Sequence, residues 1–81
     1  MAFNTWLDTF VSEKELDLDY TFEIEGDDWG MNYISLGCVI DEIKNAPVVE
    51  RNAIKKTIVK IDFVNGDVMH FFEHLAQGLA I

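Results

Sequence analysis

Cysteine and long apolar runs are scarce in this sequence of 81 residues. Cys38 is the single cysteine, which excludes an internal disulfide and a zinc cage built from thiolates. No apolar run approaches the roughly 20 residues that span a bilayer. The segment from Met1 to Asp8 lacks the basic patch and the apolar run of a signal peptide. We therefore expect one soluble domain, residues 1–81, in a reducing cytoplasm.

Basic residues are also few, and the acidic residues are unevenly distributed. Six lysines and arginines stand against 15 aspartates and glutamates, a formal net charge of −9. Residues 1–42 carry a net charge of −10, whereas residues 43–81 carry +1. A field of this sign repels nucleic acid and speeds the encounter with a cationic protein. Direct binding of DNA or RNA is therefore disfavoured, and a basic protein surface is the expected kind of partner.

Apolar and polar residues alternate strictly between Leu16 and Glu25, a period of two that is typical of a half-buried strand. The inward positions are then Leu16, Leu18, Tyr20, Phe22 and Ile24. Turn residues follow from Gly26 to Gly30, and Met31 to Ile34 is short and apolar enough to pair back as a second strand. The segment predicts an antiparallel hairpin with one apolar face and one acidic face.

Helical spacing of apolar residues surrounds this hairpin. A first helix, capped by Asn4 or Thr5, places Phe3, Leu7, Phe10 and Val11 on one stripe. Ser35 is the expected N-cap of a second helix, whose stripe is Leu36, Val39, Ile40 and Ile43. Pro47 suits the first turn of a third helix with Ile54, Thr57, Ile58 and Ile61 on its apolar side.

Residues 57–72 fit two structures. The Asn65-Gly66 pair between apolar runs is a strong hairpin signal. The spacing of Val68, Phe71, Phe72, Leu75 and Leu79, with Asp67 as the cap, instead predicts a fourth helix after a loop from Phe63 to Gly66. We favour the helix–loop–helix. The expected fold is α+β, a two-stranded antiparallel hairpin packed on about four helices in the order α-β-β-α-α-α.

Catalytic patterns are weak in this chain. His70, Glu73 and His74 spell the H-x-x-E-H motif of some zinc hydrolases, but a third ligand is missing and these residues lie opposite the apolar stripe. Asp17, Asp19 and Thr21 begin like a calcium loop, yet Phe22 occupies the position of the required glycine. Cys38, inside the second helix, is expected to be a small buried residue. We predict no enzyme, no metal site and no cofactor.

The acidic face of the hairpin is the best functional signal. Alternate residues on a strand stand about 6.6 Å apart, so the carboxylates form a regular row of negative charge on a stiff element. Trp29, an aromatic residue in an acidic turn, has the composition of a binding hot spot. The predicted partner-binding residues are Asp17, Asp19, Glu23, Glu25, Asp27, Asp28 and Trp29.

With its capped first helix, its Leu-Asp-Leu-Asp strand, its Phe22-Glu23-Ile24-Glu25-Gly26 segment and its Asn65-Gly66-Asp67 to His74-Leu75-Ala76 close, the chain resembles small acidic proteins of phages and mobile elements. Among these are anti-CRISPR inhibitors of Cascade-type (class 1, type I) effector complexes. The resemblance implies a stoichiometric inhibitor in the cytoplasm of a bacterial host, which binds a subunit of such a complex without catalysis. It could thereby block guide, target or subunit assembly.

The sequence is also compatible with two other functions. The chain could be an accessory or assembly module that forms a homodimer through the apolar helices Phe3–Val11 and Val68–Leu79. It could also be a zinc-dependent hydrolase that uses His70, Glu73 and His74.

Overall fold

The computed structural model describes residues 2–25 and 31–79, which form four helices and a two-stranded hairpin. The helices are α1 (Phe3–Glu13), α2 (Leu36–Lys44), α3 (Val48–Val64) and α4 (Met69–Leu79), and the strands are β1 (Thr21–Glu25) and β2 (Met31–Ser35). The predicted α+β class and the order α-β-β-α-α-α are confirmed. Within the described ranges, no helix combines the length and the apolar character that a bilayer span requires.

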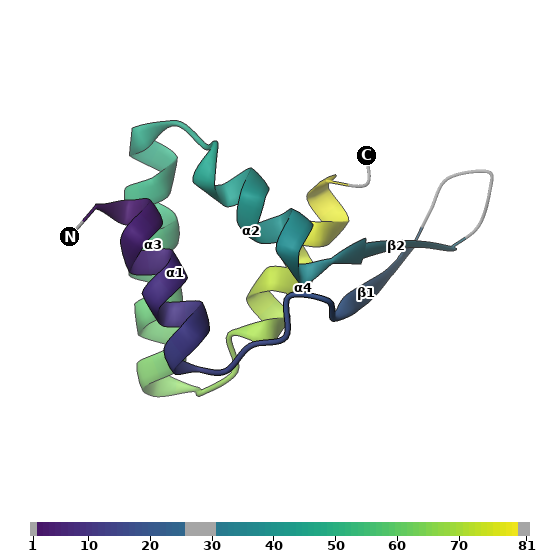
Figure 1. Cartoon of the computed structure of the whole chain (residues 1–81), viewed down its shortest axis with the longest axis horizontal. Helices are drawn as coiled ribbons and strands as arrows, with labels where there is room; N and C mark the ends of the chain where they lie inside the picture. The colour runs from purple at the N-terminus through teal and green to yellow at the C-terminus, as the bar shows by residue number, and fades with distance from the viewer. Residues whose placement is uncertain (1, 26–30, 80–81) are drawn as a thin grey trace.

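The molecule is elongated, measuring 41 × 25 × 21 Å along its principal axes. The hairpin projects at one end of the long axis, whereas α1 and α3 lie side by side at the other end (Figure 1). Between them, α4 packs against β1 and α2, and α2 also contacts β2 and α1. The two middle helices therefore join the hairpin to the rest of the protein.

One cluster of buried side chains connects all of these elements. Phe72, Leu7, Ile24, Leu36, Ile58 and Val39 are its largest fully buried members. The cluster is completed by Phe10, Val11, Phe22, Ile40, Ile43, Val68 and Ala76. The apolar stripes of α1 and α4 are thus largely used inside the protein's own core, and Leu79 is the α4 residue that remains 41% exposed. These stripes offer little surface for the homodimer considered from the sequence.

The residues that cap the helices match the sequence prediction for α2 but not for α1. Ser35 caps α2 as predicted, because its hydroxyl accepts a hydrogen bond from the Cys38 N–H at 3.2 Å. The prediction that Asn4 or Thr5 caps α1 is wrong, since Ala2 occupies that position without a side-chain bond. The helix begins earlier because Phe3, which is partly buried, packs its ring 5.9 Å from that of Trp6.

Residues 57–72 form the predicted helix–loop–helix rather than a second hairpin. Gly66 adopts a φ of +67° after α3, the left-handed conformation that glycine allows at the end of a helix. The Asp67 carboxylate, which stands two residues before the start of α4 at Met69, accepts a hydrogen bond from the His70 N–H at 3.4 Å. The loop lies two residues later than predicted, at residues 65–68, because Phe63 and Val64 belong to the last turn of α3.

Glu15, which follows α1, is the only non-glycine residue with a positive φ, 54°, among the residues that the structure describes. A side chain at this conformation brings Cβ close to the backbone, a strain that glycine avoids. We predict that Glu15→Gly raises the free energy of unfolding by roughly 0.5–1 kcal/mol. Urea denaturation followed by circular dichroism measures the change.

Glu15→Gln is the matched control, because it removes the same negative charge and keeps the Cβ atom. Its stability should stay close to that of the wild type. Equal stabilities for the glycine and glutamine variants would show that charge, and not backbone conformation, sets the effect.

Candidate functional site

The hairpin has one buried face and one exposed face. Its antiparallel register pairs Phe22 with Ile34, Glu23 with Tyr33 and Ile24 with Asn32. Phe22 and Ile24 are buried at 3% and 0% exposure, because they point towards the core that β1 shares with α4. Successive side chains of a strand point to opposite faces, so Glu23 lies on the outer face, opposite Tyr33. The outer face is therefore acidic and aromatic.

The predicted strand begins too early. Asp17 and Asp19 lie in a turn before β1, and Leu18 and Tyr20 are 46% and 51% exposed rather than buried. The register explains this difference: Thr21 pairs with Ser35, and the next residue of β2 would be Leu36, which already belongs to α2. Residues before Thr21 therefore have no strand to pair with.

The backbone of this turn caps α2 instead of extending the sheet. The Leu36 N–H donates to the Tyr20 carbonyl at 2.7 Å, and the Gly37 N–H donates to the Leu18 carbonyl at 2.9 Å. Both N–H groups belong to the first turn of α2, where they lack partners within the helix. A Cβ atom at position 37 would lie 3.3 Å from the Leu18 carbonyl oxygen, so glycine permits this close approach.

The predicted acidic row is therefore wrong as a continuous line of evenly spaced charges. Asp17 and Asp19 are exposed in the turn, and the Asp17 carboxylate accepts the Asp19 N–H at 2.9 Å. Glu23 is exposed on β1, and Glu25 is the last residue of that strand. Asp27, Asp28 and Trp29, which were also predicted to bind a partner, lie outside the described residues. We define the acidic face as Asp17, Asp19 and Glu23.

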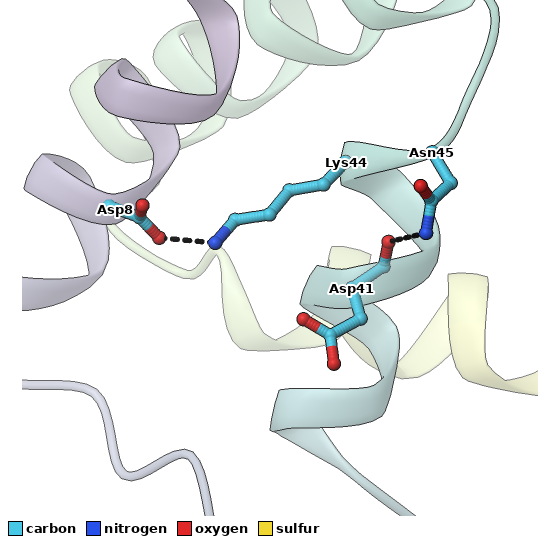
Figure 2. Close-up of polar contacts among 4 residues, drawn as sticks. All are labelled: Asp8, Asp41, Lys44 and Asn45. Carbon is cyan, nitrogen blue, oxygen red and sulfur yellow. Dashed lines mark hydrogen bonds and ion pairs between the residues drawn. The ribbon is translucent and has the colours of Figure 1, made fainter.

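Two lysines form ion pairs at sites away from the acidic face. Lys44 pairs with Asp8 between α2 and α1, close to the bond from the Asn45 amide to the Asp41 carbonyl (Figure 2). Lys14 and Asp62 join the end of α1 to α3 at 2.9 Å. Among residues 2–25 and 31–79, no ion pair involves a carboxylate of the acidic face. Its negative charges are directed to solvent without an internal cation.

Tyr33 is a candidate binding residue that the sequence interpretation missed. Its side chain is 65% exposed and lies across the ladder from Glu23. Tyr20, also exposed, packs edge-on against Phe22 with the ring centroids 5.1 Å apart. The inward position of Ile34 was the available signal, since the preceding residue of a strand must then point outward.

Cys38 is exposed, so the prediction of a buried thiol is wrong. It occupies the first turn of α2, on the side away from Leu36, Val39 and Ile40. Together with Thr21, Tyr33 and Leu79, it lines a shallow groove beside the hairpin. The thiol therefore stands next to the outer face of the hairpin.

The H-x-x-E-H residues lie on the solvent side of α4. His70, Glu73 and His74 are all exposed, and the His70 Nε2 atom lies 3.6 Å from the Asp67 carboxylate. In the part of the chain that the structure describes, no cluster of three or more histidine, cysteine or acidic side chains could hold a metal ion. The predicted polar face of this helix is thus observed.

No protein-family model, curated protein or solved structure matches the chain. The geometry of the acidic face and of Tyr33 is therefore the basis for a functional proposal.

We predict that Cys38 reacts quickly with 5,5′-dithiobis(2-nitrobenzoate) in native buffer, at a rate close to that of the urea-unfolded chain. An exposed thiol needs no opening of the fold, whereas a buried one reacts only through local unfolding. Absorbance at the thiolate product's wavelength follows the reaction, and Cys38→Ser supplies the blank. A native rate slower by orders of magnitude would contradict the exposed position.

Proposed function

We propose that the protein is a non-enzymatic acidic binding protein whose hairpin end occupies a basic surface of another protein. The observation that carries this proposal is the acidic face, where exposed carboxylates have no cation partner among the described residues. These carboxylates lie on or beside an element that projects from the body of the molecule (Figure 1). A partner can therefore approach them without displacing a helix.

The surroundings of Glu23 support a protein partner rather than a small ion. Tyr33 and Tyr20 add exposed aromatic surface beside the carboxylates. Aromatic side chains are enriched at binding hot spots, and a charged rim steers the partner and fixes its orientation. Negative charge with exposed aromatics suits a surface of arginine and lysine side chains, since arginine pairs with carboxylates and stacks on aromatic rings.

We further propose that this partner is a subunit of a bacterial defence complex that is guided by nucleic acid. The resemblance to anti-CRISPR inhibitors of Cascade-type complexes motivates this choice. Grooves that hold a nucleic-acid backbone are lined with lysine and arginine, because they must neutralise phosphates. An acidic protein can occupy such a groove as a competitor, and its action is then stoichiometric and needs no catalytic residue.

We predict that the double variant Asp19→Lys/Glu23→Lys binds purified Cascade-type effector complexes at least about 100-fold more weakly than the wild type does, because each reversal replaces an attraction by a repulsion. Biolayer interferometry at near-physiological salt measures the affinity. Wild-type binding should also weaken steeply as salt is raised, since exposed charges are screened.

Glu13→Lys/Glu73→Lys is the matched control for this experiment. Both residues are exposed, lie on α1 and α4, and produce the same change in net charge. This variant should bind within a fewfold of the wild type. If the two variants lose affinity equally, the total charge is responsible and the acidic face has no special part.

A panel of effector complexes separates the two parts of the proposal. If none of them binds the wild type, the defence complex is excluded as the partner. The broader proposal then depends on whether another basic protein binds in a way that Asp19→Lys/Glu23→Lys abolishes.

A further inference from the structure

The outward side of α3 carries five of the nine large apolar side chains that are exposed in the described part of the protein. Five of its side chains are between 47% and 88% exposed: Val48, Val49, Val59, Phe63 and Val64. We call this set, with Lys55, Lys56 and Lys60 beside it, the outer face of α3. The opposite side of the same helix supplies Ile54, Ile58 and Ile61 to the core. Exposed apolar side chains that gather on one side of a surface helix often mark an interaction site.

The area of this face suits a small protein interface. A 17-residue helix is about 25 Å long, and its five exposed apolar side chains present on the order of 500 Å² of surface. Monomeric proteins rarely leave larger patches in water. Two such faces in contact bury roughly 1,000 Å², the lower limit for a specific and reversible interface.

The spacing along α3 favours another helix as the occupant. Val49, Asn52, Lys56, Val59 and Phe63 follow one another at intervals of three and four residues, the seam of a heptad repeat. A polar residue in such a seam specifies the register of helix pairing and lowers the stability of the pair. Asn52 and Lys56 are the polar residues of this seam. The pattern is independent of the stripe that faces the core.

The pattern is also nearly symmetric about Lys56. Val48 and Val49 lie eight and seven residues before it, and Phe63 and Val64 lie seven and eight residues after it. Antiparallel pairing about a two-fold axis therefore brings the valines of one copy against Phe63 and Val64 of the other. It also opposes the two helix dipoles. The long lysine side chains can extend from the axis into solvent.

We propose that the outer face of α3 pairs with the same face of a second copy of this chain, forming an antiparallel homodimer. Helix α3 lies at the end of the molecule opposite the hairpin (Figure 1), so this face is separate from the hairpin strands. The interface differs from the acidic face and is independent of the proposed inhibitor function.

Sedimentation velocity of the full chain from about 1 μM to about 1 mM tests the pairing. We expect a reversible monomer–dimer equilibrium that becomes tighter as salt is raised, because salt screens the lysines that meet at the axis. Phe63→Glu should weaken dimerisation at least about 100-fold, since the substitution enters the interface twice. Val49→Glu, at the other end of the helix, should have a similar effect.

Tyr33→Glu is the control, because it adds the same charge at an exposed aromatic position on the hairpin. It should leave the dimer unchanged. Circular dichroism should show wild-type helix content for all three variants, as each replaced side chain is at least 65% exposed.

Several results would overturn the proposal. A monomer at every concentration and salt excludes self-pairing. Association that Asp19→Lys/Glu23→Lys abolishes is head-to-tail contact between the acidic face and the lysines of α3. Binding of the monomer to phosphatidylserine vesicles, lost in Phe63→Glu, assigns the face to a membrane surface.

Discussion

The structure depends on the contact between the inner face of the hairpin and the helices behind it. Phe22 and Ile24 are buried in the same cluster as Phe72 of α4 and Leu36 of α2. A two-stranded hairpin is at best marginally stable alone in water, so β1 and β2 hold their shape because these helices cover one side. The C-terminal helix therefore determines the geometry of residues near the N-terminus, and damage to the core at Phe72 would reach the acidic face.

Charge is divided between the two ends of the molecule by this arrangement. At the helical end, Lys14 forms an ion pair with Asp62. The Nζ atom of Lys55 lies 5.2 Å from the centroid of the Trp6 ring. Such exposed pairs contribute little to stability, typically below about 1 kcal/mol. Their larger effect is on the electrostatic field of the protein, because these cations lie on the helices and do not neutralise Asp19 or Glu23. The molecule consequently presents a negative hairpin end and a nearly neutral helical end, since the charges of α1 and α3 cancel.

Patterns of neighbouring residues predict which segments form helices and strands. They do not predict where β1 begins or which side of α2 is exposed. The cap of α2 at Ser35 and the helical conformation of α4 are determined by residues close together in the sequence, and both predictions are confirmed. The start of β1 was wrong because alternation continues back to Leu16, whereas the partner strand ends at Ser35. Only tertiary pairing limits the strand. Cys38 lies in the predicted helix but on its exposed side, because it falls outside the apolar stripe of Leu36, Val39 and Ile40.

The second apolar side of α3 was missed for a related reason. A sequence pattern assigns one apolar face to a surface helix, and the isoleucines of α3 satisfied that expectation. Val48, Val49, Val59 and Phe63 then have no place in a single small domain. The acidic face lies on β1 and the turn before it, on other elements than this face of α3, and exposed charges farther apart than the Debye length of about 8 Å at physiological salt are largely screened. Screening by salt therefore weakens the repulsion between two chains of charge −9, and a dimer formed through α3 would carry two acidic faces.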